Sequence, residues 1–79
     1  MKAILIKNLK QLVRIDKKAH ENGYKWTTEI AFNNSQNLKE LDLPCYLIIT
    51  KINNKKVLCW GKELPAEDFI LVKKEEEFI

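Results

Sequence analysis

Residues 45–60, CYLIITKINNKKVLCW, carry the strongest β-strand pattern in the chain. Cys45 to Ile52 and Lys55 to Trp60 are rich in apolar and β-branched residues, which is typical of strands. Asn53-Asn54 separates them, and because Asn tolerates positive φ, this pair suits the type I′ turn of a hairpin. The predicted register pairs Ile52 with Lys55, Ile49 with Leu58, Ile48 with Cys59 and Leu47 with Trp60.

The residues before the hairpin predict a strand and then a helix. Lys2 to Lys7, KAILIK, is short and apolar, as expected of a first strand. Asn8 and Gln11 have the spacing of a capping box, and Gly23 suits the left-handed position that ends a helix. We therefore expect a helix from Leu9 to about Asn22. Its predicted apolar side contains Leu9, Leu12, Val13, Ile15 and Ala19.

The other segments complete a β-α-β-β-β-β order. We expect a second short strand within Tyr24 to Phe32, a polar break at residues 33–37 and a last strand at Phe69 to Val72. Between them we expect one helical turn that Asn37 and Glu40 cap and Pro44 ends. The natural arrangement is an α+β fold, in which one main helix packs on a small, mainly antiparallel sheet.

Length and composition indicate a small intracellular domain. With 79 residues, 46% of them hydrophobic, the chain is expected to form a single α+β domain over residues 1–73, followed by a charged C-terminal tail, 74–79. Two alternatives stay open for this tail: it is disordered, or Phe78 and Ile79 dock on the domain. No run of about 18 apolar residues is present, and the N-terminus lacks a signal-peptide pattern. We therefore expect a cytoplasmic protein with no membrane partner and with reduced cysteines.

Both faces of the predicted hairpin are apolar, although one long helix can cover only one of them. One alternative is that the loop around Leu38, Leu41 and Leu43 covers the second face. The other is a homo-oligomer interface, because large exposed apolar patches rarely lack a partner. The residues expected at that interface are Tyr46, Ile48 and Val57.

Catalytic and metal-binding patterns are weak. Asp16 and His20 lie four residues apart on the helix, where they can form a hydrogen bond, but no nucleophile accompanies them. A structural pair is therefore the preferred interpretation. Cys45 and Cys59 fall on opposite faces of the hairpin, which predicts two buried thiols, no disulfide and no zinc site. We expect no enzyme activity, no metal and no cofactor.

Positive charge gathers on the outer side of the predicted helix and just after it. The net charge is only +3, so this side is either a solvated surface or an anion-binding patch. Neighbouring aromatic residues suit stacking with a flat group, although each has an equally good reason to be core. The candidate ligand-binding residues are Lys10, Arg14, Lys17, Lys25, Tyr24, Trp26 and Trp60.

The order of strand, helix, Gly23-Tyr24-Lys25-Trp26 and apolar hairpin resembles small phage and prophage accessory proteins, in which a helix ending in Gly-Tyr-x-Trp precedes an antiparallel sheet. The resemblance implies a counter-defence factor that binds a host protein or sequesters a nucleotide signal in the host cytoplasm. The first hypothesis is therefore a binding protein for an anionic small molecule such as a signalling nucleotide. The alternatives are a protein–protein inhibitor that uses an apolar sheet face and, less favoured, a nucleic-acid binder.

Overall fold

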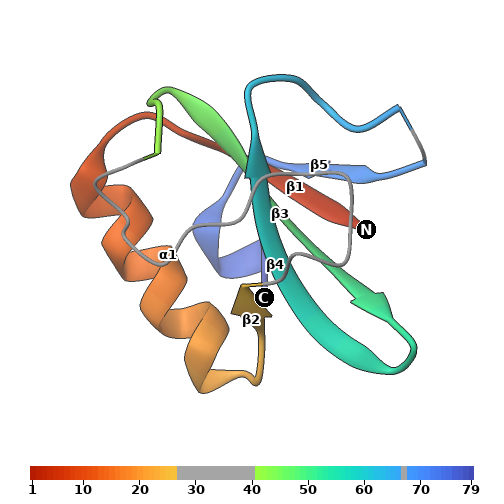
Figure 1. Ribbon diagram of the computed structural model, residues 1–79. Coiled ribbons are helices and arrows are strands. Elements are labelled where there is room, and N and C mark those ends of the chain that lie inside the picture. Colours follow the sequence, from red (N-terminus) through yellow and green to blue (C-terminus); the bar gives the residue numbers. More distant parts are fainter. Residues whose placement is uncertain (27–40, 67) are drawn as a thin grey trace.

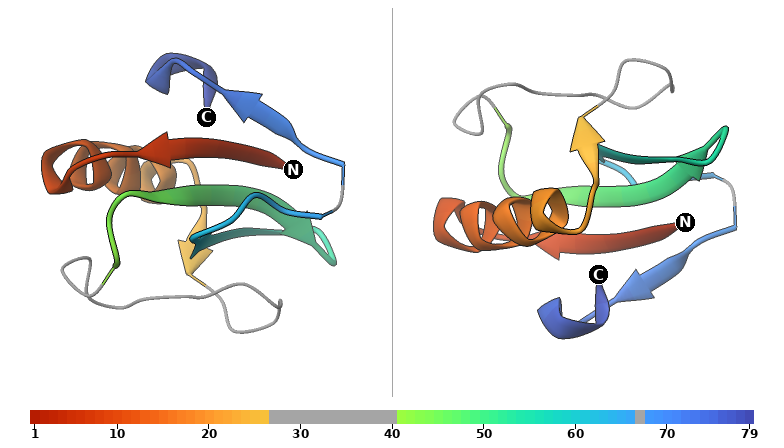
Figure 2. Two further views of the ribbon diagram at one scale, coloured as in Figure 1. Left: turned by 90° about the horizontal axis from the view of Figure 1, so that it is seen from above. Right: turned by 90° about the horizontal axis from the view of Figure 1, so that it is seen from below.

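The computed structural model describes residues 1–26, 41–66 and 68–79 (Figure 1). The elements are β1 (Lys2–Ile6), α1 (Leu9–Glu21), β2 (Lys25–Trp26), β3 (Cys45–Ile52), β4 (Lys55–Gly61), β5 (Ile70–Val72) and the 3-10 turn η2 (Glu75–Glu77). One helix packs on one face of a five-stranded sheet, which confirms the predicted α+β fold (Figure 2). The predicted polar break at 33–37, and the capping residues Asn37 and Glu40 of the predicted helical turn, lie outside the described residues.

The sheet has the strand order β2-β4-β3-β1-β5. β3 is antiparallel to both β4 and β1, but β5 is parallel to β1 and β2 is parallel to β4. The sheet is therefore mainly antiparallel, as predicted, but not purely so, because its two short edge strands pair in parallel. Both parallel pairs join strands that are distant in sequence, so no local pattern in the chain could reveal them.

The β3–β4 hairpin has the register expected from its turn. Leu47 lies opposite Trp60, and Ile48 lies opposite Cys59. Asn53 and Asn54 have φ values of 51° and 67°. Both are left-handed, as a type I′ turn requires, and this turn fixes which side chains share a face.

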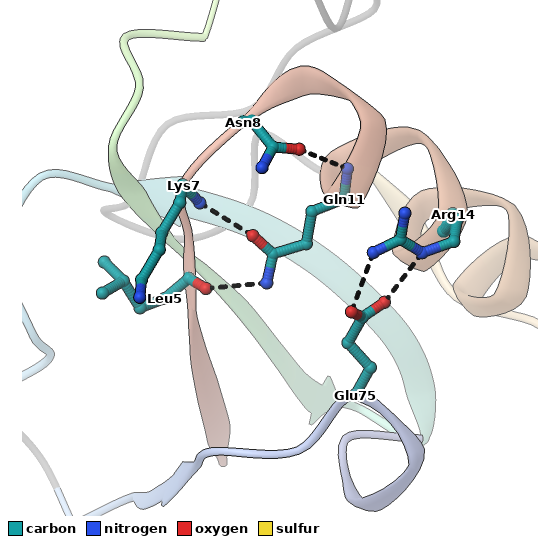
Figure 3. A network of polar contacts seen from close by, with 6 residues as sticks. All are labelled: Leu5, Lys7, Asn8, Gln11, Arg14 and Glu75. Atoms are coloured by element: carbon teal, nitrogen blue, oxygen red, sulfur yellow. Dashed lines mark hydrogen bonds and ion pairs between the residues drawn. The ribbon is translucent and has the colours of Figure 1, made fainter.

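Polar side chains fix the first turn of α1 and tie it to β1. The side chain of Asn8 accepts a hydrogen bond from the Gln11 N–H at 2.9 Å, as the capping spacing predicted. The Gln11 side-chain oxygen accepts from the N–H of Lys7 at 2.8 Å, one residue before the position of a standard capping box. Gln11 Nε2 donates to the Leu5 carbonyl at 3.1 Å, so the side chain also joins the helix to the strand (Figure 3).

Gly23 ends the helix as expected. Its φ is 89°, and its N–H donates to the carbonyl of His20 at 3.0 Å. The N–H of Tyr24 donates to the carbonyl of Ala19, also at 3.0 Å. These two bonds form a Schellman motif, which satisfies the last carbonyls and turns the chain toward the sheet.

The helix buries a narrower stripe than the sequence predicted. Leu12, Ile15 and Ala19 are buried against the sheet, whereas Leu9 and Val13 are 39% and 48% exposed. At about 100° per residue, Leu9 and Val13 lie about 90° and 130° from the centre of the buried stripe. Leu9 and Val13 therefore lie at the margins of the predicted apolar side, because apolar character alone does not determine which part of a helix is covered.

The C-terminal residues belong to the domain. Phe78 is fully buried in the same core as the buried face of α1, and Ile79 packs against that core. The Lys2 ammonium also donates to the Glu77 carbonyl at 3.2 Å. The predicted boundary at residue 73 therefore divides residues that share one core, and residues 74–79 are not a separate tail.

The second face of the sheet has a small core of its own. Ala3, Ile48 and Cys59 are fully buried there, with the partly buried Met1 and Phe69 packed against them. Val57 is only 4% exposed. Of the three residues expected at an oligomer interface, Tyr46 is half-buried, whereas Ile48 and Val57 are buried within the chain and are not available to a second copy.

Candidate functional site

The basic side of α1 is exposed, as predicted, but its arginine already has a partner. Lys10 and Lys17 are exposed. Arg14 donates from Nε and Nη2 to the two carboxylate oxygens of Glu75, at 3.2 and 2.9 Å (Figure 3). This hydrogen bond and the charge of Glu75 raise the pKa of Arg14, and the bond from Arg14 lowers the pKa of Glu75. An anion at Arg14 would have to compete with a bidentate carboxylate.

The structure does not bring the seven predicted ligand residues together. α1 has 13 residues and is therefore about 20 Å long. Lys10 lies in its first turn, while Tyr24 follows its last turn, so one small ligand cannot contact both. Lys25 is exposed on β2, and Trp60 is half-buried on β4. Among the described residues, the buried Trp60 Nε1 has no hydrogen-bond partner.

Asp16 organises the polar contacts on the inner side of α1. Trp26 Nε1 donates to Asp16 Oδ1 at 3.1 Å. Nδ1 of His20 lies 2.8 Å from the backbone carbonyl of Asp16 and 3.3 Å from Oδ1. The carboxylate thereby anchors Trp26, which packs against the main core. Trp26 is therefore a packing residue in this structure, and its ring nitrogen is already occupied.

The two cysteines are buried thiols without nucleophilic character. Burial raises the pKa of Cys45 to about 11 and that of Cys59 to about 12, so both are protonated at neutral pH. Cys59 Sγ donates to the Ile48 carbonyl at 3.7 Å. In the described ranges, no group of three or more His, Cys, Asp or Glu side chains is placed to hold a metal ion.

A surface hollow of about 360 Å³ brings a predicted aromatic residue together with lysines that were not predicted. We call it the Tyr24 hollow; its lining residues are Met1, Lys2, Tyr24, Ile49, Thr50, Lys51 and Ile79. The ammonium of Lys56 lies 5.4 Å from the centre of the Tyr24 ring, a cation–π distance. The same ammonium donates to the Asn22 carbonyl at 3.0 Å, at the end of α1. The hollow therefore combines an aromatic ring with positive charge.

The register of the β3–β4 hairpin brings two lysines together near the Tyr24 hollow. Lys51 lies directly opposite Lys56. Side chains at opposed positions of an antiparallel pair share a face, and like charges placed this way repel each other. The contact of Lys56 with Asn22 and Tyr24 draws its charge toward the end of α1. Because this register follows from the sequence, the Lys51–Lys56 pair is the signal in the sequence that indicates the site.

No family model, curated protein or solved structure matches this chain. The resemblance to phage accessory proteins therefore remains a prediction from the sequence. The helix in the described part of the chain is too short and too polar to cross a membrane.

Proposed function

We propose that the protein is a non-enzymatic binding protein that sequesters an anionic small molecule, with a phosphate-bearing nucleotide as the favoured class. The observation that carries this proposal is the Tyr24 hollow, where Lys2 and Lys51 line a surface beside an aromatic ring. Its volume of about 360 Å³ falls in the range of small-molecule sites, about 300–1,000 Å³. The hollow is a better candidate than the outer side of α1, where Glu75 already neutralises Arg14.

Electrostatics explain why an anion is the expected ligand. Lys51 and Lys56 are cross-strand neighbours of like charge, an arrangement that costs stability until a counter-charge relieves it. A phosphate group beside Lys51 supplies that counter-charge and accepts hydrogen bonds from the ammonium. Lysine attracts an anion as a point charge and discriminates little between shapes, so the apolar wall at Ile49 and the Tyr24 ring contribute the selectivity.

The contact of Lys56 with Tyr24 limits how a base can bind. Lys56 covers the ring from one side, and the ring also packs against the core. We therefore expect the phosphate to contribute more to affinity than stacking of the base. A nucleotide-sequestering protein of this kind suits a phage-encoded counter-defence role in the cytoplasm of the host, which is the role implied by the sequence resemblance.

The test compares two charge reversals of the same type at different places. Binding of ATP, of pyrophosphate and of adenosine is measured by calorimetry at low salt. Lys51→Glu should weaken ATP and pyrophosphate binding by about tenfold or more, equivalent to about 1.4 kcal/mol. Lys17→Glu, an exposed lysine on α1, is the matched control and should leave binding nearly unchanged.

Three outcomes would contradict the proposal. The first is that neither phosphate compound binds. The second is equal binding of adenosine and ATP, which would show that charge is not recognised. The third is that Lys17→Glu abolishes binding while Lys51→Glu does not, which would move the site to the outer side of α1.

A further inference from the structure

β5 is an edge strand of the described sheet and presents apolar side chains to solvent. It pairs with β1 on one side and is the last strand in the sheet order (Figure 2). Ile70 is 62% exposed, and Leu71 is 44% exposed. Natural edge strands are usually protected by charge, proline or a bulge. All three residues of β5 are instead aliphatic.

The backbone of β5 is oriented for further pairing. The Ile70 N–H donates to the Met1 carbonyl at 2.9 Å, so the polar groups of Ile70 face β1. Because backbone groups alternate in direction along a strand, the N–H and C=O of Leu71 point away from the sheet. The backbone of Lys74 is also extended, with φ −112° and ψ 135°, so a pairing edge can continue past Val72.

We propose that two copies of the chain form a dimer by antiparallel pairing of β5 with β5 of the second copy. A two-fold axis at Leu71 places this residue opposite its own copy, where the outward N–H and C=O groups exchange two hydrogen bonds. The same register places Ile70 opposite Val72 of the second copy and Asp68 opposite Lys74. The two five-stranded sheets then become one continuous sheet.

Charge complementarity favours a second copy over an unrelated strand. The edge carries the acidic Asp68 at its beginning and the basic Lys74 at its end, and both are exposed. Antiparallel self-pairing brings these opposite charges together twice in each dimer, on the same face as Ile70. Parallel self-pairing would place like charges side by side. The order of the charges, acidic at the start of the segment and basic at its end, therefore favours antiparallel pairing.

The apolar surroundings also favour this contact. A hollow of about 380 Å³ lies beside the edge, and its lining includes Leu5, Tyr46 and Leu71. When Leu71 pairs with its copy, the equivalent hollows of the two chains lie close together across the two-fold axis. It also covers Ile70, the most exposed large apolar residue in the described part of the chain. A domain of 79 residues has a small core, and small domains commonly gain stability by burying apolar surface in an oligomer.

The proposal is tested by sedimentation velocity on the full chain up to about 1 mM, a range in which weak protein contacts become populated. The mass should rise from 9.3 kDa toward twice that value with concentration. Ile70→Lys should remain monomeric through the series. Val13→Lys, which places the same charge at another exposed aliphatic residue, should dimerise like the natural chain. Circular dichroism establishes that both variants are folded.

A charge exchange tests the register itself. Asp68→Lys and Lys74→Asp should each weaken dimerisation by about tenfold, because each replaces two attractive pairs with repulsive ones. The double variant should return the dissociation constant to within about threefold of the original. A constant mass of 9.3 kDa, a dimer that survives Ile70→Lys, or no recovery in the double variant would each overturn the proposal. None of these measurements depends on a nucleotide, so they stand apart from the proposed function.

Discussion

Replacing Phe78 with alanine should remove a large part of the protein's stability, although the residue follows a run of charged residues. Phe78 is 0% exposed and lies in the main core with Leu12 and Ile15 of α1. Truncating a buried phenylalanine costs about 3–5 kcal/mol. At about 0.05–0.15 kcal/mol per residue, a chain of 79 residues has only about 4–12 kcal/mol of stability to lose.

Urea denaturation followed by tryptophan fluorescence measures this loss. With a slope of about 1 kcal/mol per M, the unfolding midpoint of Phe78→Ala should fall by about 3 M or more. Glu76→Ala, an exposed position in the same 3-10 turn, is the control and should shift the midpoint by less than about 0.5 M. If both variants unfold together with the unchanged protein, the segment after β5 is not part of the core.

Three further predictions concern α1, its ion pair and the thiols. Leu12→Ala should lower the unfolding free energy by about 2–5 kcal/mol in the same assay, while Lys18→Ala should be nearly silent; equal losses would refute the packing of the helix. Because Arg14 lowers the pKa of Glu75, the ion pair stabilises the fold above the unfolded-state pKa and is lost as pH falls through the folded one. The stability difference from Glu75→Gln should therefore be small, since both side chains are exposed, and should vanish in acid; a difference that grows toward low pH would contradict this sign. Both cysteine thiols should react with a thiol reagent only after unfolding, and rapid native labelling would disprove their burial.

The sequence was informative wherever local geometry decides the structure. Asn53-Asn54 predicted the turn because few residues accept positive φ at two consecutive positions, and the turn then determined the β3–β4 register. Asn8 and Gly23 predicted the helix ends because each satisfies a specific backbone requirement there. The turn and the helix ends depend on contacts between residues close together in the sequence, so the local sequence is enough to predict them.

Contacts between distant segments could not be predicted in the same way. Nothing local indicates that β5 pairs with β1, or that Phe78 packs beside the helix. The candidate site illustrates the same limit. Tyr24 was identified because it is aromatic and follows a basic helix, but Lys2 reaches the Tyr24 hollow only through the pairing of β1 with β3. Lys51 and Lys56 were within reach of sequence reasoning, since the register already placed them opposite each other.

An NMR titration of the ¹⁵N-labelled chain with ATP shows directly whether an anion binds at the Tyr24 hollow. The largest amide shifts should cluster at Tyr24, Thr50 and Lys51, which line one hollow although Tyr24 is distant in sequence from the other two. Pyrophosphate should also shift the amide resonance of Lys51. Shifts confined to Lys10 and the rest of the outer side of α1, or no localised shifts at all, would contradict an anion site at the Tyr24 hollow.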